Sequence, residues 1–266
     1  MEGIIVIKCG GSTMEQLPDT FFQAIAKLQG EGKPIVIVHG GGPAINGMLD
    51  KVQITPQFVD GLRVTCEDTL RVVEMVLCGS INKALVRRLT QAGAKAWGAS
   101  GIDGQTLIAE KTTKPLGWVG EVKQADTTIP LAILGQGYVP VIAPLSVSAD
   151  GSDAFNVNAD IAAGAIAASL SAEKLVMVTD VPGILRPLPD GSKELVQETS
   201  ADEIHQMIAD DVITGGMIPK VQAALDALSQ GVNQVVICRG TAEDLLAVSA
   251  GEAVGTTVRM NVIQPQ

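Results

Sequence analysis

The sequence predicts an α/β protein, built as a three-layer αβα sandwich around an open, mainly parallel β-sheet. Its 266 residues are 46% hydrophobic but only 3% aromatic, a composition typical of strands packed between closely spaced helices. Unbroken β-branched runs at 4–7 and 35–38 indicate strands that are buried on both faces. Helical and strand patterns alternate along the chain, so successive strands are expected to lie parallel.

Glycine loops follow the first two strands. The strand at 4–7 leads into Lys8, Gly10 and Gly11, and the strand at 35–38 leads into Gly40, Gly41 and Gly42. The segment 21–28 between them has helical spacing. Because ligands of open parallel sheets gather beyond the carboxyl ends of the strands, both loops are expected to face one site. A fixed cation, bare backbone N–H groups and the helix that Pro43 opens are the components of a phosphate cradle.

The longest helical pattern runs from Glu67 to Gln91, and Gly79-Ser80 is expected to bend or divide it. Its apolar face is wider than one sheet usually covers, which predicts a homodimer interface. Further along, 95–97 and 138–142 are predicted strands, 131–134 is a predicted helix, and 106–111 with 118–122 form a predicted hairpin arm. No linker, low-complexity tract or strong internal repeat interrupts this alternation.

Polar residues with a marked spacing occur at Asn156, Asn158 and Asp160. In an extended segment, residues two apart share a face, so both asparagines are expected to point the same way while Val157 points into the core. Asn158 is also a predicted cap for the helix at 159–170, with Asp160 in its first turn. Arg63 lies in a short turn-like segment, where it is either a surface arginine or a bidentate carboxylate ligand.

A second lysine follows glycines in the last third of the chain. The predicted strand at 175–178 ends in a loop that contains Thr179, Asp180 and Gly183, a position suited to a nucleotide. Gly215 and Gly216 then precede Lys220, which lies near the start of a predicted helix. A lysine is unfavourable near the N-terminus of a helix, because that end carries the positive charge of the helix dipole. The placement of Lys220 therefore indicates a functional role, in which the helix and Lys220 together bind a phosphate.

Composition excludes several other classes. The net charge of −10 and the absence of a basic stripe argue against nucleic-acid binding. The four cysteines lack Cys-x-x-Cys spacing, and His39 and His205 have no partner at metal-ligand spacing. There is no Gly-x-x-x-x-Gly-Lys-Ser/Thr loop, so the chain is not a P-loop kinase. No apolar run is long enough to span a bilayer, and the first residues lack a basic leader, so a cytoplasmic protein with no membrane partner is expected.

Six motifs, in order and over nearly the full chain, resemble those of the N-acetyl-L-glutamate kinases of the amino-acid kinase family. They are Ile7-Lys8-Cys-Gly-Gly11, Val36-Ile-Val-His-Gly-Gly-Gly42, Gly61-Leu-Arg63-Val-Thr, Asn156-Val-Asn158-Ala-Asp160, Val178-Thr-Asp180-Val-Pro-Gly183 and Gly215-Gly-Met-Ile-Pro-Lys220. The resemblance implies the amino-acid kinase fold, with one continuous sheet shared by two lobes. It implies that residues 1–171 bind the acyl-amino acid and form the dimer, and that residues 172–266 bind ATP.

The resemblance also implies a reaction, the transfer of the ATP γ-phosphoryl group to the side-chain carboxylate of N-acetyl-L-glutamate, an early step of arginine biosynthesis. Lys8 and Lys220 would contact the transferring phosphoryl group and the leaving β-phosphate, and Asp160 would hold both lysines. Mg²⁺ would be carried by the ATP phosphates without a protein metal site. The acceptor would be bound by Gly41, Gly42, Arg63, Asn156 and Asn158, and the nucleotide by Gly10, Gly11, Thr179, Asp180, Gly183, Gly215 and Gly216. Arginine-inhibited members carry an additional helix before the first strand, whereas this sequence starts directly with the predicted strand at 4–7. Neither arginine feedback nor a hexamer is therefore expected.

Two alternatives stay open at this stage. One is a kinase of a related small acid, such as N-acetyl-aminoadipate, carbamate or aspartate, since one methylene changes pocket discrimination by only ~1–3 kcal/mol. The other is a noncatalytic module that senses a nucleotide or an amino acid. The presence of Lys8, Asp160 and Lys220 disfavours the second alternative, because a sensor could lose the transfer lysines without losing binding.

Overall fold

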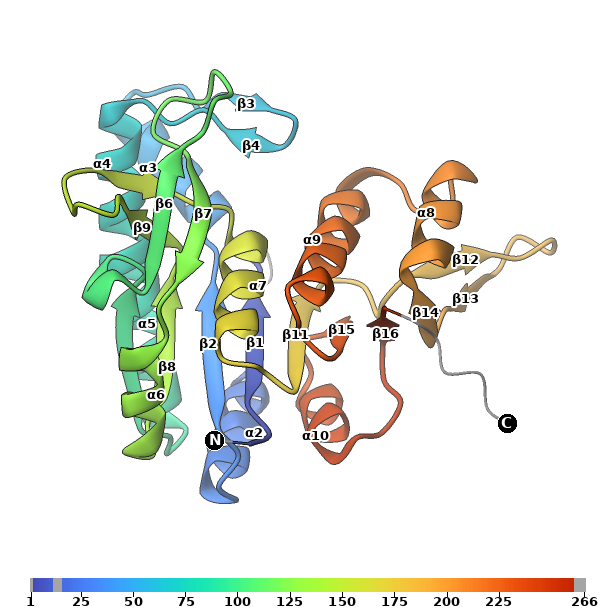
Figure 1. Cartoon of the computed structure of the whole chain (residues 1–266). Helices are drawn as coiled ribbons and strands as arrows, with labels where there is room; N and C mark the ends of the chain where they lie inside the picture. The colour runs from blue at the N-terminus through green and yellow to red at the C-terminus, as the bar shows by residue number, and fades with distance from the viewer. Residues whose placement is uncertain (1, 12–15, 261–266) are drawn as a thin grey trace.

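The computed structural model describes residues 2–11 and 16–260 and contains a central sheet of eight strands (Figure 1). In spatial order these are β14 (Glu198–Ser200), β16 (Thr256–Arg259), β15 (Val235–Arg239), β11 (Lys174–Thr179), β1 (Ile5–Cys9), β2 (Ile35–His39), β8 (Val139–Ala143) and β5 (Ala96–Ser100). The predicted α/β class with an open, mainly parallel sheet is confirmed.

Strand pairing follows the crossover expectation. β1 lies between β2 and β11 and is parallel to both, with Ile5 opposite Ile35 on one side and Lys174 on the other. Among the neighbouring pairs of this sheet, β15 and β16 are antiparallel, which the sequence did not predict. The carboxyl ends of β1 and β2 therefore lie at the same edge of the sheet, which places the two glycine loops that follow them side by side, as expected.

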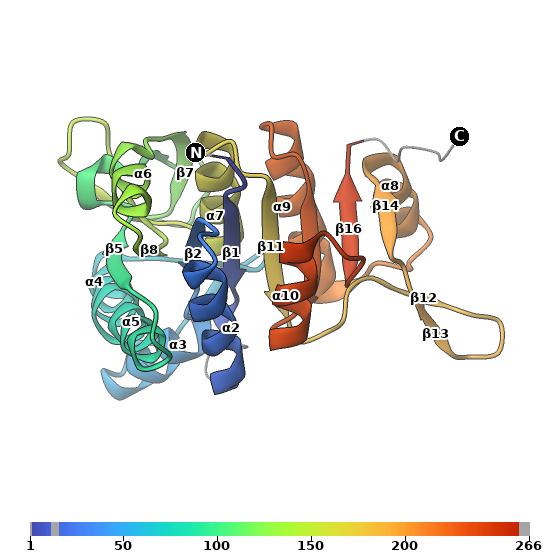
Figure 2. The same cartoon turned by 90° about the horizontal axis from the view of Figure 1, so that it is seen from below.

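Alternate residues of the strands point to opposite faces of the sheet and pack against two helix layers, which Figure 2 shows on opposite sides of the sheet. Val6 packs into one layer, whereas Ile5 and Ile7 pack into the other. The first layer contains α6 (Thr128–Gly135), α7 (Ala159–Ser169), α8 (Ala201–Ala209) and α9 (Ile218–Ser229); the second contains α2 (Asp19–Gly30), α5 (Asn82–Gln91) and α10 (Ala242–Ala250). Each fully buried isoleucine or valine contributes ~1.5–3 kcal/mol of transfer free energy, which is why strands with two apolar faces lie between helices.

The long helical pattern is one path with an irregular middle. It consists of α4 (Glu67–Glu74), a π-helical segment η1 (Met75–Ile81) that contains Gly79-Ser80, and α5. The chain itself covers most of the broad apolar face, because Val72, Val73, Val76 and Leu77 pack against α3 (Gly42–Lys51) and the end of the sheet. Met75 stays exposed. The surplus of apolar surface on this helix is thus smaller than its periodicity indicates.

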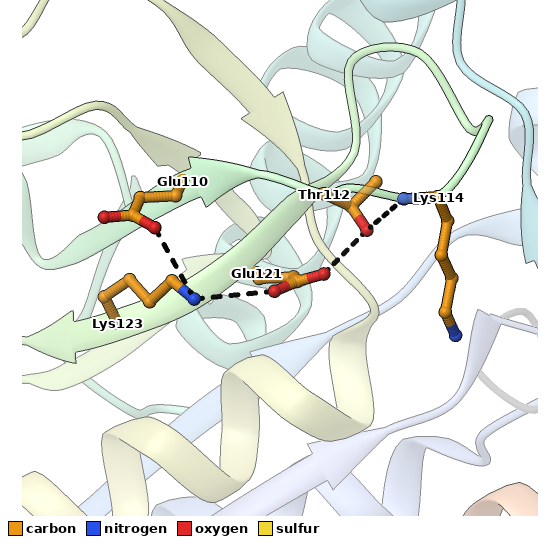
Figure 3. Close-up of polar contacts among 5 residues, drawn as sticks. All are labelled: Glu110, Thr112, Lys114, Glu121 and Lys123. Carbon is orange, nitrogen blue, oxygen red and sulfur yellow. Dashed lines mark hydrogen bonds and ion pairs between the residues drawn. The ribbon is translucent and has the colours of Figure 1, made fainter.

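A second, four-stranded sheet flanks the first, with the order β10 (Ala154–Asn156), β9 (Leu145–Val147), β6 (Leu107–Lys111) and β7 (Gly120–Ala125). The predicted hairpin arm is confirmed by the antiparallel pairing of β6 with β7. Figure 3 shows the polar contacts on this arm: the Thr112 hydroxyl donates to Glu121 at 2.7 Å, and the Lys123 ammonium lies 3.4 Å from Glu121 and 3.6 Å from Glu110. The Thr112 bond is the main cause of a lowered pKa of the Glu121 carboxyl.

The remaining elements are short. They are the hairpins β3–β4 (Phe58–Val59 and Leu62–Arg63) and β12–β13 (Leu185–Pro187 and Lys193–Leu195), and the 3₁₀ segments η2 (Asp103–Gln105) and η3 (Gly215–Met217). The β3–β4 hairpin lies at the upper end of the structure in Figure 1, on the side toward which β1 and β11 point. Within the described ranges, none of the helices has the length and apolar character that crossing a membrane requires.

Candidate active site

A cavity of about 220 Å³ opens at the carboxyl ends of β1 and β2. It is lined by Lys8, Gly11, Gly40, Gly41, Gly42, Ile45, Phe58, Gly61, Leu62, Arg63, Leu77, Val119, Pro144, Asn156, Val157, Asn158, Ala159 and Asp160. The two glycine loops meet here, because a Cβ placed on Gly11 would lie 2.6 Å from the Gly42 nitrogen and 2.7 Å from the Gly41 nitrogen. Only a residue without a side chain permits that approach.

Lys8 and Asp160 form an ion pair inside this cavity. The Lys8 ammonium lies 2.5 Å from Asp160 Oδ1, and their side chains are only 5% and 13% exposed. Asp160 is in the first turn of α7, where the helix dipole favours a carboxylate. Burying one of these charges alone would cost several kcal/mol, so the pair stabilises a lysine that the buried strand β1 could not otherwise hold at its end.

The two asparagines have the predicted geometry. Asn158 caps α7, with its Oδ1 accepting from the backbone N–H groups of Asp160 at 2.8 Å and Ile161 at 3.3 Å, and Val157 is buried. Asn156 Nδ2 donates to the Thr65 hydroxyl at 3.1 Å. The two amides are therefore engaged through different atoms, Asn158 through its oxygen and Asn156 through its NH₂ group. The NH₂ group of Asn158 and the amide oxygen of Asn156 are left for a ligand.

Arg63 is a buried cavity residue and not a surface arginine. It is 8% exposed, it donates from Nη2 to Asn46 Oδ1 at 2.6 Å, and its guanidinium stacks over the Phe58 ring at 4.7 Å. Burial lowers the pKa of the Arg63 guanidinium from its ordinary value. Nη1 is buried and has no hydrogen-bond partner among the described residues. A buried donor without a partner indicates a ligand, because leaving it unpaired costs ~1–3 kcal/mol.

Asn46 and Phe58 were not singled out in the sequence. Asn46 lies one helical turn after Gly42 in α3, and Phe58 lies across the β3–β4 hairpin from Arg63. Local spacing is the signal that the sequence offers for these two contacts. Nothing in the composition of α3 indicates that Asn46 contacts an arginine 17 positions away.

The second lysine lies beside this cavity rather than in its lining. Burial, and then the charge of Lys8, lower the pKa of the Lys220 ammonium, while the carboxylates of Asp160 and Asp180 partly offset this shift. Lys220 therefore lies within electrostatic range of Lys8 and Asp160. No ion pair within 4.0 Å joins Lys220 to Asp160 in the described part of the chain, so Asp160 contacts one of the two lysines directly, and not both.

The predicted nucleotide residues come from three places. Gly10 and Gly11 follow β1, Thr179 ends β11 and donates from its hydroxyl to Asp180 Oδ1 at 3.0 Å, and Gly215 and Gly216 precede α9. Gly183 has φ +151° and approaches β16 closely: an added Cβ would lie 2.5 Å from the Thr256 hydroxyl oxygen. Of the residues predicted to bind nucleotide, the cavity lining contains Gly11.

His39 is fully buried directly before the glycine run. Its Nδ1 lies 3.0 Å from the Gly40 carbonyl oxygen, and its Nε2 lies 3.2 Å from Asn82 Nδ2. Burial is the main cause that lowers the pKa of the His39 imidazole to about 4. The contact of His39 with Asn82 joins residues 43 positions apart, and nothing in the sequence around His39 predicts it.

The lowered pKa of His39 predicts a pH-dependent stability. Between pH 6.5 and about 4 the unfolded chain binds a proton at His39 that the folded chain excludes. The corresponding stability is fully present above pH 6.5 and is lost as the pH falls toward 4, by about 3 kcal/mol in total. Denaturant unfolding should show a shallower loss over this window in His39→Asn than in the parent. His205→Asn, which replaces an exposed histidine, is the matched control; equal slopes for the parent and His39→Asn would contradict the assignment.

The comparisons with known proteins agree with this geometry. The model of the amino acid kinase family matches residues 3–239, and the chain belongs to this family. It is 81% identical over 262 residues to an acetylglutamate kinase of Brevibacillus brevis, covering 98% of this chain and 99% of the relative. It is 44% identical to an acetylglutamate kinase of Halalkalibacterium halodurans, covering 100% of both. The crystal structure of smu.665 from Streptococcus mutans UA159 superposes with a TM-score of 0.85 at 33% identity and covers 98% of this chain and 100% of that chain.

Proposed function

We propose that this protein transfers the γ-phosphoryl group of ATP to the side-chain carboxylate of N-acetyl-L-glutamate, forming an acyl phosphate in an early step of arginine biosynthesis. The observation that carries the proposal is the convergence, in one cavity, of the Lys8–Asp160 pair, the two glycine loops and the unpaired guanidinium nitrogen of Arg63. The identity to acetylglutamate kinases over nearly the full chain supports the same substrate.

Arg63 and the asparagines suit an acetylated amino acid. The free Nη1 of Arg63 would donate to the α-carboxylate, which is held more firmly by a guanidinium than by any other side chain. The Asn156 amide oxygen, whose own NH₂ is engaged with Thr65, would accept the substrate's acetamido N–H. The Asn158 NH₂ group would donate to an oxygen of the acceptor, because its Oδ1 already caps α7.

The reaction needs no general base. A side-chain carboxylate has a pKa near 4.3 and is already ionised at neutral pH. One carboxylate oxygen forms a bond to the γ-phosphorus, the bond between that phosphorus and the β,γ-bridging oxygen breaks, and the electron pair leaves with ADP; no proton moves. The barrier is the repulsion between two anions, so the residues required are fixed cations and N–H donors, here Lys8, Lys220 and the glycine loops.

The nucleotide is proposed to occupy the part of the chain formed by residues 172–266, with the acceptor held by residues 1–171. Thr179, Asp180, Gly183, Gly215 and Gly216 would then surround ATP at the edge of the sheet where β11 ends. Mg²⁺ would enter with the ATP phosphates and neutralise charge there. An ATP-consuming biosynthetic step of this kind belongs to the cytoplasm, and that location is part of the proposal.

The test is ADP release in the presence of MgATP and one candidate acceptor at a time. N-acetyl-L-glutamate is expected to give the highest kcat/KM, and hydroxylamine should trap the product as a hydroxamate. Higher kcat/KM with N-acetyl-aminoadipate, carbamate or aspartate would transfer the proposal to that acid. Binding of N-acetyl-L-glutamate without any ADP release would replace catalysis by ligand sensing.

Arg63→Lys is expected to raise the KM of the acceptor by at least tenfold, with little change in the KM of ATP. An ammonium cannot bond to Asn46 and to a carboxylate in the planar, two-point manner of a guanidinium. Steady-state kinetics with each substrate varied in turn measures the two constants. Arg87→Lys, at an exposed arginine, is the matched control. Equal losses for both substrates would mean that Arg63 does not bind the acceptor.

The protein is proposed to be a homodimer through the α4–η1–α5 path. The apolar surface along this path consists of exposed Met75 and of a groove lined in part by Ala44, Ile81 and Leu85. Light scattering at micromolar concentration is expected to give about twice the chain mass of 27.5 kDa. Met75→Asp should weaken the association, since it places a charge on that surface. A monomeric parent protein would remove the idea.

A further inference from the structure

His39 and Asn82 form a polar contact in the interior behind the cavity, and both are fully buried. Asn82 Nδ2 lies 2.9 Å from the Val141 carbonyl oxygen, 3.1 Å from the Ala99 carbonyl oxygen and 3.2 Å from His39 Nε2. Buried polar groups are costly unless each has a partner, and here both ring nitrogens and the Asn82 NH₂ have one, so the arrangement holds the two side chains in one geometry.

The chemistry of these contacts fixes the tautomer of His39. Two carbonyl oxygens can only accept, so the group of Asn82 that faces them is its NH₂. The Gly40 carbonyl oxygen can only accept as well, so the proton of the neutral ring is on Nδ1. Nε2 presents its lone pair to the Asn82 NH₂, whose two hydrogens are shared among three acceptors. From Nδ1 the proton is donated to the Gly40 carbonyl oxygen at 3.0 Å.

That bond fixes the orientation of one peptide unit. In a trans peptide the C=O and the following N–H point in opposite directions, and no described peptide bond is cis. With the Gly40 carbonyl turned toward the buried ring, the Gly41 N–H points the other way. This agrees with the position of the Gly41 nitrogen against Gly11, which lines the cavity.

Glycine peptides turn over easily, and the opposite orientation would present a carbonyl oxygen to the cavity. An oxygen at that position would repel the phosphoryl and carboxylate anions of the proposed reaction. We infer that His39 is a positioning residue, which keeps the Gly40–Gly41 peptide in the orientation that offers its N–H to the anion, while Asn82 fixes the tautomer that makes this possible. The inference takes its chemical meaning from the proposed phosphoryl transfer.

The tautomer is testable in the parent protein, because the chain contains only two histidines. With ¹⁵N-labelled histidine, NMR at neutral pH is expected to show the buried ring protonated at Nδ1 and unprotonated at Nε2, and His205→Asn assigns the two sets of signals. A proton on Nε2 of His39 would overturn the inference. This measurement does not depend on any activity, so it stands even if ADP release fails and the proposed function falls.

Two isosteric substitutions separate positioning from packing. The amide of Asn places an NH₂ near the position of Nδ1, and the amide of Gln places an acceptor near the position of Nε2. His39→Asn can keep the bond to the Gly40 carbonyl, whereas His39→Gln can keep only the contact with Asn82. His39→Gln is expected to lower kcat by at least tenfold with a smaller change in the acceptor KM, because one preorganised donor is worth about 10²-fold to 10³-fold. His39→Asn should retain kcat within a few-fold.

Thermal unfolding of both variants supplies the control for stability. Each variant loses one buried hydrogen bond, so their melting temperatures should fall by similar amounts. A purely structural role predicts equal kcat values that follow the melting temperatures, and that result would overturn the inference. An unfolded His39→Gln would leave the decision to the NMR experiment and to the kcat of His39→Asn, which must stay close to that of the parent.

Discussion

Lys8→Met is expected to lower kcat and kcat/KM together by about 10²-fold or more, while the acceptor KM changes less. The Lys8 ammonium is held by Asp160 at the end of a buried strand, with almost no contact with water. A cation in such a setting is already desolvated and oriented, so its interaction with a phosphoryl group strengthens as charge moves toward the leaving oxygen. Methionine keeps most of the volume of the lysine side chain, is one heavy atom shorter, and removes the charge together with its N–H donors.

Loss of folding must be separated from loss of catalysis in this variant. Removing Lys8 leaves the Asp160 carboxylate buried and unpaired, which destabilises a protein by ~3–5 kcal/mol. The double variant Lys8→Met with Asp160→Asn carries neither charge and should recover most of the lost melting temperature. Its kcat should stay as low as that of the single variant. Recovery of kcat together with stability would mean that the ammonium has no part in the chemistry.

The sequence was sufficient where one residue's environment depends on near neighbours. The short β-branched runs at 4–7 and 35–38, each followed closely by glycines, predicted β1 and β2, because length, β-branched content and flanking glycines favour a buried strand over a buried helix. The spacing of Asn156 and Asn158 predicted both the cap of α7 and the burial of Val157. The crossover rule then placed two glycine loops at one edge of the sheet, and they do line one cavity.

It was insufficient where the outcome depends on packing between distant segments. The π-helical segment η1 has no periodic signature of its own, and Gly79-Ser80 indicated only that the helix would be irregular. The burial of Arg63 depends on Asn46 and Phe58, which belong to different elements. The contact of His39 with Asn82 joins β2 to the start of α5, and neither residue is unusual in its local sequence.

The separation of Lys220 from Asp160 is a further result that spacing could not provide. Asp160 was expected to hold both lysines. Within the part of the chain that the structure describes, it forms an ion pair with Lys8 and not with Lys220, and its charge acts on the pKa of Lys220 without direct contact. Burial and the charge of Lys8 lower the pKa of the Lys220 ammonium, and an anion between the two lysines would offset the effect of that charge. An ATP phosphate is the anion that the proposed reaction supplies, and Asp160 holds the arrangement in its absence.

The combined substitutions of Asp160 and Lys220 are therefore expected to be less than multiplicative. Lys220→Ala should lower kcat by about 10²-fold through the loss of one preorganised cation. Asp160→Ala should also lower kcat, because it frees Lys8 and removes a carboxylate that offsets the repulsion on Lys220. Once Asp160 is gone, the lysines are already misplaced, and removing Lys220 should lower kcat by a smaller factor than it does in the parent.

Steady-state kinetics on the four proteins of this cycle measures the coupling, and the corresponding cycle of Asp160 with Lys8 is its reference. Asp160 touches Lys8 but not Lys220, so the coupling to Lys8 should be the larger of the two. Coupling energies between contacting groups reach ~0.5–3 kcal/mol, whereas distant groups add within ~0.3–0.5 kcal/mol. Fully multiplicative losses for Asp160 and Lys220 would show that the aspartate acts through Lys8 alone, and a larger coupling to Lys220 would show that the two lysines exchange partners when ATP is bound.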